Sequence, residues 1–529
     1  MLARRLAVYL DVERGFDEPL QRAAHHAYCP PPEERPTSGN PERGRDVPSL
    51  HGGTGRPIDR RLLPPSRRLD LARATCRAPA VVAGEFDGAL IQRPPSAVLP
   101  AMHEQGCDTM RSTSDGAAAA SAEGLGPGRR LAARARRGVR EACTIGVRAG
   151  LPPSWVGYRH VVPVSAQDHV ASMRAKGVAF ARCETIHARA VARNPLPFNV
   201  ADRDLLPADA GWWGYSMRDV PARTSEETFI ATIPDARIVP VHDWRGEFFP
   251  ALLTRDQRAL NLREMKFRDA HAAALRRGAP PQRFERATWI CERVYDNHSH
   301  WLTAHLPKLV LLRDRGALGE VLLPRSPTPA MRASLRMMGL DPDAFRTVDG
   351  DRPIEVARLT ILGTDRFRPE LLRPVREALA PVAAAPTRRV YVSRERARMR
   401  KLANEDEIWP LFEAAGFQRV FMEELDFPRQ VRLMSETTVL AAPHGAGLTN
   451  MMFCPPGARV LEIAWLGFPN PNFYALASAM GHRWGIVAAQ PRGPGSPLER
   501  DMYVDPAAVE TALDALARTA AAPAGPDPV

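Results

Sequence analysis

A glycine-rich turn between two apolar segments is the part of the sequence best suited to chemistry. Thr438–Ala442 is an apolar run, His444-Gly445-Ala446-Gly447 follows as a turn of small residues, and Arg459–Ala464 is a second apolar run. Strand, glycine turn, helix and strand in this order place a helix N-terminus and free backbone N–H groups against a phosphate. Glycine lets the backbone approach a bulky anion, because no Cβ intervenes. The segment therefore predicts a binding site for a nucleoside diphosphate.

Several side chains accompany this turn. The side chains of His444, Thr449 and Asn450 would add hydrogen-bond donors at this binding site. Glu462 lies in the second apolar run, where a carboxylate could hold a ribose. Arg394 follows another predicted strand, at the edge where a parallel sheet opens its ligand crevice. A planar guanidinium suits phosphate better than the point charge of lysine does. Arg394 is therefore predicted to bind the diphosphate together with the turn.

The longer string HGAGLTN, followed by Phe453, Pro455-Pro456-Gly457 and Glu462-Ile463, is similar to a signature of glycosyltransferase family 61. That family includes bacterial capsular-polysaccharide enzymes and eukaryotic sugar transferases. Three further stretches, in the family's order, strengthen the resemblance: Arg389–Arg394 with Arg400 and Asn404-Glu405, Gly416–Val431, and Asn297–Pro307. The resemblance covers residues 200–500 and is strongest from Arg388 to Glu462.

The resemblance implies a donor site in the second half of the chain. Its residues would be Arg394, Asn404, Glu405, Gln430, His444, Gly445, Ala446, Gly447, Thr449, Asn450 and Glu462. Two of them have open alternatives. Glu405 either favours a helix dipole or orients Arg394 or a donor hydroxyl, and Gln430 either contacts the donor or packs the lobe.

Glycosyl transfer also needs a base for the acceptor hydroxyl. His300 precedes Trp301-Leu302 as the family's histidine does, between a predicted strand and helix, so it is the leading candidate and Asp296 the second. The alternative is that His300 caps the helix or orders the lobe. His298, His300 and His305 do not have a recognised zinc spacing, and Asp341 and Asp343 suit a capping turn. No metal and no cofactor are predicted.

The composition narrows the partners and the compartment. The formal charge is +12, but lysine occurs only at positions 176, 266, 308 and 401, and no basic run is interleaved with aromatics. This argues against a nucleic-acid partner. The 7 cysteines are scattered and contain no Cys-x-x-Cys pair, which favours a reducing compartment. No apolar stretch is long enough to span a membrane. The expected location is the cytoplasm, and peripheral binding at the inner face of the membrane is a second option.

Composition and periodicity divide the chain into four parts. Residues 1–150 are rich in Pro, Gly, Ala and Arg and are expected to be a mostly disordered extension, with Arg129–Arg140 as a basic helix whose alternative role is membrane-surface binding. Residues 155–330 predict an α/β lobe with β-hairpins on the acceptor side, including a turn at Pro234-Asp235. Residues 331–520 predict a Rossmann-like lobe on the nucleotide-sugar side, and 521–529 a disordered tail.

Strand–helix alternation in two blocks predicts two doubly wound parallel sheets, and the resemblance implies two Rossmann-like lobes of the glycosyltransferase B architecture. It also implies an inverting, metal-independent transferase that takes a nucleotide-sugar donor and a glycan or lipid-linked glycan acceptor in bacterial capsular, exo- or lipopolysaccharide synthesis. Two alternatives stay open. One is an NAD(P)-dependent oxidoreductase built on the glycine turn, although the third glycine is missing. The other is a non-catalytic scaffold of a polysaccharide-assembly complex.

Overall fold

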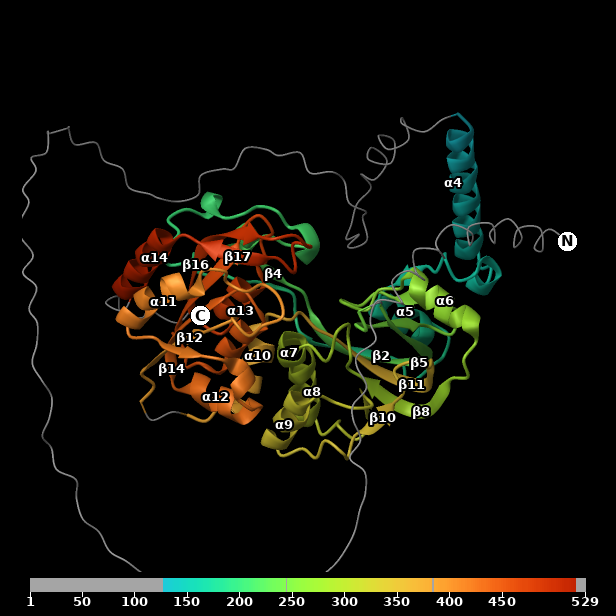
Figure 1. Ribbon diagram of the computed structural model, residues 1–529. Coiled ribbons are helices and arrows are strands. Elements are labelled where there is room, and N and C mark those ends of the chain that lie inside the picture. Colours follow the sequence, from blue (N-terminus) through green and yellow to red (C-terminus); the bar gives the residue numbers. More distant parts are fainter. Residues whose placement is uncertain (1–126, 244, 383–384, 520–529) are drawn as a thin grey trace, which may run out of the picture. The chain divides into compact units, whose positions relative to one another are not determined.

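The computed structural model describes residues 127–243, 245–382 and 385–519 (Figure 1). Most of the predicted N-terminal extension and the predicted tail at 521–529 lie outside these residues. The described end of the extension departs from the expected disorder, because Pro127–Arg148 forms helix α4. Alanine, leucine and arginine, which are strong helix formers, dominate the predicted Arg129–Arg140, and the helix continues to Arg148, where Val147 is buried. No helix in the described ranges is long and apolar enough to cross a membrane.

The first sheet is mixed rather than wholly parallel. Its order is β1-β7-β6-β5-β11-β8-β9-β10, with β2 also paired to β5. The pairs along β11-β8-β9-β10 and β1-β7 are parallel, and β5 pairs antiparallel with β2, β6 and β11. The strands are β1 (Pro163–Val164), β2 (Arg182–His187), β5 (Thr228–His242), β6 (Phe248–Leu253), β7 (Ala259–Leu260), β8 (Gln282–Trp289), β9 (Val321–Pro324), β10 (Arg346–Val348) and β11 (Ile354–Gly363).

The turn predicted at Pro234-Asp235 is not a turn. Strand β5 runs through it, and Asp235 takes a left-handed backbone (φ 45°) without ending the strand. Pairing with β11 continues on both sides of this position, at Pro234 and Ala236, and β6 pairs with β5 only from Arg237 onward. Local turn preference is overridden here by the hydrogen bonds to β11.

One face of the first sheet has a polar stretch. Arg237 and Arg283 flank Glu355 on neighbouring strands and form ion pairs with it. Farther along β5 the same face is apolar, because Val239 and Leu253 pack with Ala274 and Leu275 of α6 (Asp269–Arg277). Helix α5 (Ala166–Ala175) packs against β2 and β5. A partly polar face is typical of antiparallel pairing, which explains why the prediction of a parallel doubly wound sheet fits only part of this lobe.

The second sheet matches the predicted Rossmann-like lobe closely. Its order is β13-β12-β14-β15-β16-β17, parallel except for the edge strand β17. The elements are β12 (Arg388–Val392), α11 (Glu405–Ala414), β13 (Gln418–Val420), α12 (Phe427–Ser435), β14 (Thr437–Pro443), η8 (Ala446–Phe453), β15 (Arg459–Trp465), α13 (Asn472–Ala479), β16 (Arg483–Arg492), β17 (Asp501–Val504) and α14 (Pro506–Arg518). The mixed α/β fold class is thereby confirmed.

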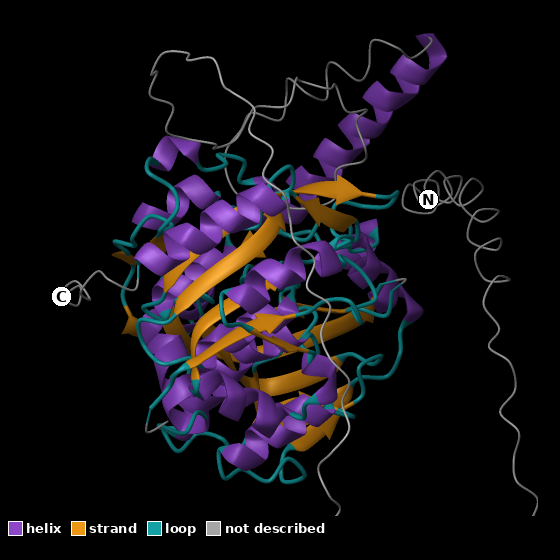
Figure 2. Ribbon diagram, turned by 60° about the vertical axis from the view of Figure 1, so that its left-hand side comes forward, coloured by secondary structure: helices purple, strands orange, loops and turns teal. Residues whose placement is uncertain are grey.

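Helices cover both faces of this second sheet (Figure 2). Alternate strand residues such as Tyr391 and Leu461 pack against α11 and α14, in one apolar cluster. The residues between them, such as Val390 and Val460, pack with α12, α13 and η8 in a second cluster. Burial on both faces produces the nearly continuous apolar runs that made these strands readable from sequence.

The boundary between the two lobes differs from the predicted 330/331. Strands β10 and β11 follow residue 330, yet both belong to the first sheet, which therefore extends to Gly363. Conversely, an early segment crosses to the second sheet: the Asn199 amide binds the backbone of Ile486 on β16, and Tyr474 donates to the carbonyl of Pro195. These hydrogen bonds satisfy backbone groups of β16, so the chain order and the spatial order of the lobes diverge.

The remaining elements connect the sheets. The helix after β8 has three parts, α7 (His298–His300), the π-helical η6 (Trp301–His305) and α8 (Leu306–Arg313). Pro307 has no N–H to give to a carbonyl four residues earlier, which favours the wider π turn. The others are α9 (Pro329–Met337), α10 (Pro369–Leu379), β3 (Ala190–Val191), β4 (Thr224–Ser225), η2 (Pro153–Val156), η3 (Arg203–Leu205), η4 (Gly211–Trp213), η5 (Met217–Ala222) and η7 (Met422–Glu424).

Candidate functional site

A cavity of about 230 Å³ lies at the point where the strand order of the second sheet reverses. The chain leaves β12 for β13 on one side and returns to β14 on the other, so the carboxyl ends of β12 and β14 border the crevice where ligands bind in such sheets. We call this the switch-point cavity. Its lining residues are His298, Val392, Ser393, Arg394, Met422, Glu423, Gln430, Ala442, Pro443, Ala446, Gly447, Leu448 and Asn450.

Arg394 lines this cavity from the end of β12. Its Nε donates to the carbonyl of Arg400 (3.1 Å) and its Nη2 to that of Met399 (2.7 Å). Burial lowers its pKa to about 10. A Cβ on Gly445 would lie 1.9 Å from Nη1, so glycine is needed here for the close approach of the guanidinium. The predicted partnership of Arg394 with the glycine turn is thus a direct contact.

Glu405 and Asn404 lie at the start of helix α11, and Glu405 supports this strand end. The carboxylate of Glu405 accepts from the Ser393 hydroxyl, from the Arg394 backbone N–H (3.3 Å) and from Arg419. Glu405 therefore orients Arg394 through its backbone, one of the alternatives left open by the sequence.

Asn404 does not reach the cavity. Its amide binds both the N–H and the carbonyl of Val504 and donates to Glu407, so the side chain joins α11 to β17. The prediction that it binds a donor is not supported by this position.

Hydrogen bonds link three polar side chains at the cavity. The Gln430 Nε2 donates to the carbonyls of Met422 and Leu425 (both 3.0 Å), which fixes the orientation of its amide. Its Oε1 accepts from Asn450 Nδ2 (3.1 Å), so Asn450 presents Oδ1 to the Nε2 of His298 (2.8 Å). His298 must then carry its proton on Nε2, and its Nδ1 keeps a lone pair.

From sequence, His298 was considered only as a metal ligand, and its place in the lining of the switch-point cavity makes it a candidate that was missed. Burial lowers its pKa, while the hydrogen bond to Asn450 opposes that shift. A neutral histidine with an oriented tautomer and a lone pair at a cavity can accept a proton. The sequence feature that could have pointed to His298 is its place at a predicted strand-to-helix junction.

Neither predicted base lines the switch-point cavity. His300 lies 3.5 Å from Arg366 through its Nε2, and its Nδ1 is buried with no hydrogen-bond partner in the described chain. Burial and the charge of Arg366 hold the pKa of His300 well below 6.5. Asp296 is exposed beside the helix start. This arrangement gives His300 poor means to accept a proton, because an arginine already occupies its Nε2.

Two further predicted donor residues face the protein interior. Thr449 is fully buried and its hydroxyl has no partner within the described residues. Glu462 lies in the middle of β15, not at its end, and its carboxylate accepts from His444 Nδ1 (2.5 Å) and Trp484 Nε1 (3.2 Å). The predicted ribose contact by Glu462 is therefore wrong, since both oxygens are buried and paired.

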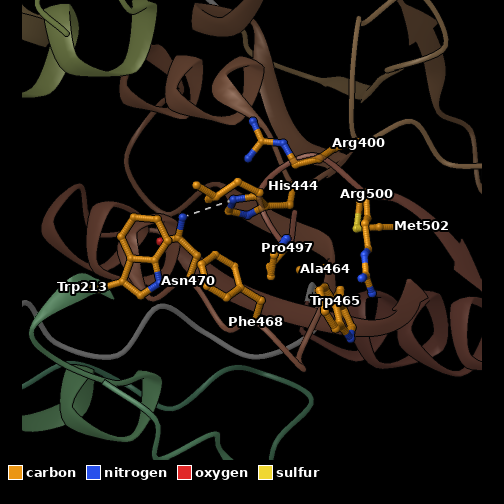
Figure 3. Close-up of a pocket in the computed structure, with 11 residues that line it drawn as sticks. Trp213, Arg400, His444, Ala464, Trp465, Phe468, Asn470, Pro497, Arg500 and Met502 are labelled. Atoms are coloured by element: carbon orange, nitrogen blue, oxygen red, sulfur yellow. Dashed lines mark hydrogen bonds between the residues drawn. The ribbon is translucent and has the colours of Figure 1, made fainter. Parts of the chain in front are cut away.

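His444 belongs to a second, smaller cavity of about 30 Å³ beside the glycine turn (Figure 3). Trp213, Trp465 and Phe468 line it, and we call it the aromatic cavity. The Nε2 of His444 accepts from Asn470 Nδ2 (3.2 Å). Burial lowers the pKa of His444, and the hydrogen bond to Glu462 opposes the shift.

Arg400 also lines the aromatic cavity and was not assigned from sequence. Its backbone is left-handed (φ 57°), an uncommon state for a residue other than glycine. Its Nε is buried without a hydrogen-bond partner in the described chain, and its carbonyl accepts from Arg394. Burial lowers its pKa. The sequence feature that could have pointed to Arg400 is its spacing from Arg394 in the family-like stretch.

The histidines considered as metal ligands do not converge. Both ring nitrogens of His305 pair with the backbone, at Glu292 N–H and the His300 carbonyl. No group of three or more His, Cys, Asp and Glu side chains in the described ranges is placed to hold a metal ion. Asp341 accepts from the N–H of Asp343, which binds Arg332, as a capping turn requires.

Fold and cavity together define an α/β protein with a ligand site at a Rossmann-type switch point. Residues 299–461 match the glycosyltransferase 61 family model. This segment contains the switch-point cavity except for His298, which precedes it by one residue.

Relatives of known activity match a shorter stretch. The chain is 38% identical over 98 residues to the EGF domain-specific O-linked N-acetylglucosamine transferase of Drosophila melanogaster. It is 36% identical over 104 residues to the alpha-1,3-arabinosyltransferase XAT3 of Oryza sativa subsp. japonica. Each match spans 18% of this chain and 18% of the relative. The relatives are thus similar over less than a fifth of their length.

Proposed function

We propose that the protein is a glycosyltransferase that moves a sugar from a nucleotide-sugar donor to a hydroxyl of a glycan acceptor. The observation that carries this proposal is the switch-point cavity bordered by Arg394, inside a segment that matches the glycosyltransferase 61 family. The similarity to an N-acetylglucosamine transferase and to arabinosyltransferases supports the reaction class.

The donor diphosphate rests on Arg394, Arg400 and the glycine turn. The Nη1 of Arg394 lies against Gly445, and the first N–H groups of η8 have no acceptor inside the helix. As the bond between the anomeric carbon and the diphosphate breaks, negative charge develops on the leaving oxygen. Guanidinium groups held in a low-dielectric site stabilise that charge more strongly than water does.

His298 is the base for the acceptor hydroxyl. Its Nδ1 takes the proton as the acceptor oxygen bonds to the anomeric carbon, and the diphosphate leaves with the electron pair of the broken bond. The chain from Gln430 through Asn450 to His298 Nε2 holds the required tautomer. His300 and Asp296, predicted for this role from the resemblance, are the competing candidates.

The finer assignment rests on the sequence resemblance. It implies inverting, metal-independent transfer to a glycan or lipid-linked glycan in bacterial capsular, exo- or lipopolysaccharide synthesis. Direct in-line attack by an acceptor hydroxyl on the anomeric carbon, with a single base, agrees with inversion.

A ligand screen by thermal unfolding tests the proposal. Nucleoside diphosphates should raise the unfolding temperature, because a ligand that binds only the folded state stabilises it by mass action. NAD should not, since the turn lacks a dinucleotide fingerprint. Calorimetry on hits would compare wild type with Arg394→Ala. Stabilisation by NAD and by no nucleoside diphosphate would instead favour the oxidoreductase alternative.

A further inference from the structure

Helix α4 carries an apolar stripe that no described residue covers. Leu131, Ala135, Val139, Ala142 and Ile145 recur at intervals of three and four residues, so they share one face of the helix. All five are exposed, and the exposed fractions of Leu131 and Ile145 are 71% and 67%. The stripe spans 15 residues, from Leu131 to Ile145, or about 21 Å of helix.

The opposite side of α4 is strongly basic. The exposed arginines are Arg134, Arg136, Arg137, Arg140 and Arg148. Glu141 is the single acidic residue in the sequence of the helix. An apolar stripe flanked by arginines on a helix of this length is typical of helices that lie in the plane of a membrane interface.

Residues near the C-terminal end of α4 connect it to the rest of the domain. Val147 is buried, and the Thr144 hydroxyl lies 3.2 Å from His160 Nδ1. Further apolar exposure follows directly in the chain, where Trp155 is 74% exposed. Tryptophan prefers the membrane–water interface, because its ring is apolar and its N–H is polar. The exposed apolar residues therefore continue past the helix.

We propose that α4 docks on an anionic lipid surface, with the stripe in the acyl boundary and the arginines among the headgroups. Charge complementarity selects this partner, because five exposed arginines against one glutamate would be attracted to anionic lipid and only weakly held by a neutral protein groove. The inference is independent of the proposed activity. It gives the extension a physical role that the catalytic domain does not need.

Co-sedimentation of the full chain with vesicles tests this. Vesicles containing phosphatidylglycerol should bind the protein, pure phosphatidylcholine vesicles should bind it far less, and salt should weaken binding. Leu131→Asp with Ile145→Asp should reduce the partition coefficient by about 100-fold, because both side chains leave the acyl boundary. Val382→Asp, at a 98% exposed residue outside α4, is the matched control and should bind as wild type.

A second pair separates charge from apolar burial. Arg137→Gln with Arg140→Gln should lower binding to anionic vesicles about tenfold, while Arg193→Gln with Arg483→Gln, at exposed residues elsewhere, should change it little. All these positions are exposed, and circular dichroism with thermal melts verifies folding. Absent binding by wild type, or binding that the α4 variants leave unchanged, would overturn the proposal. So would salt-sensitive binding to duplex nucleic acid, lost in the α4 variants, without vesicle binding.

Discussion

Each sheet has an arginine directly beyond a parallel strand, but only one of the two lines the switch-point cavity. Arg366 follows β11 and donates through Nε and Nη2 to the hydroxyl of Thr303. Arg394 follows β12, donates to carbonyls of its own loop and lines the switch-point cavity. Burial lowers the pKa of both to about 10. A perturbed arginine at a strand end is therefore not by itself a sign of a ligand site.

The neighbours of the two arginines explain the difference. Asp365 lies next to Arg366 and forms ion pairs with Arg223 and Arg263, so charges of both signs fill the first strand end. Beside Arg394, Gly445 leaves room for the guanidinium. The first strand end uses arginine to build the interior of the lobe, and the second keeps arginine at an opening.

Each of the two histidines of helix α7 contacts a different one of these regions. Their substitution gives the largest expected effect on kcat. His298 reaches Asn450 at the switch-point cavity, and His300 reaches Arg366. His298→Ala should lower kcat by about 10²–10⁴-fold, the range for loss of a general base, with donor affinity nearly unchanged. His300→Ala, two residues away, should change kcat much less. The opposite ranking, or a comparable loss only in Glu423→Gln, would remove His298 from the reaction.

Two glycines sharpen the comparison next. A Cβ on Gly445 would meet the end of the flexible Arg394 side chain at 1.9 Å, and one on Gly363 would meet the Phe229 ring at 2.1 Å. Gly445→Ala should displace the guanidinium and weaken nucleoside diphosphate binding about tenfold or more, with little loss of stability.

Gly363→Ala should instead overpack the first sheet and cost about 1–3 kcal/mol in the free energy of unfolding, with affinity unchanged in the folded protein. Calorimetry and urea unfolding on both variants measure the two effects. Equal losses of affinity would show that the lobes are not separable in this way.

The arginines themselves provide the third test. Arg394→Met removes a charge-assisted phosphate contact and should cost about 1.5–3 kcal/mol of diphosphate binding free energy. Arg366→Met removes a guanidinium that has the same lowered pKa but does not line the switch-point cavity, and it should leave that affinity unchanged. Titration calorimetry with a nucleoside diphosphate on both variants measures the two affinities. Loss of affinity in both variants would extend the ligand site to the first strand end.

The second sheet was largely predictable from sequence, and the first was not. Strands buried on both faces, such as β14 and β15, give continuous apolar runs, and the glycine turn between them has a physical reason to be glycine. Strand β5 pairs with β11, more than a hundred residues away, and no local pattern reports that pairing. The predicted boundary at 330/331 failed for the same reason.

At the site, backbone features were predictable and side-chain directions were not. Arg394 and the glycine turn follow from strand ends, which sequence periodicity locates. Whether Glu462 faces a ligand or the core depends on its place within β15, since neighbouring strand residues point to opposite faces. The choice between His298 and His300 depends on Arg366 and Asn450, which approach from distant parts of the chain.

The smallest expected effect concerns two buried histidines, one in each lobe, that bind no ligand in the proposed mechanism. His271 is paired through Nδ1 to the Arg268 N–H and through Nε2 to the Phe249 carbonyl. His482 binds the Met451 carbonyl through Nε2. Burial lowers the pKa of each to about 4 from an ordinary value of 6.5.

These lowered pKa values predict a loss of stability in acid. Because the unfolded chain takes up these protons first, stability is full above pH 6.5 and declines as the pH falls toward 4. At pH 5.5, one unit below the unfolded pKa, each histidine should cost about 1.4 kcal/mol of unfolding free energy. His271→Gln and His482→Gln should each remove that increment, so their stability should fall less than that of wild type between pH 8 and pH 5.5. Urea unfolding at both pH values measures the difference. Parallel pH dependences for a variant and wild type would mean that its histidine has the same pKa in the folded and unfolded chain. Equal increments would show that the lobes, unlike in ligand binding, respond alike to acid.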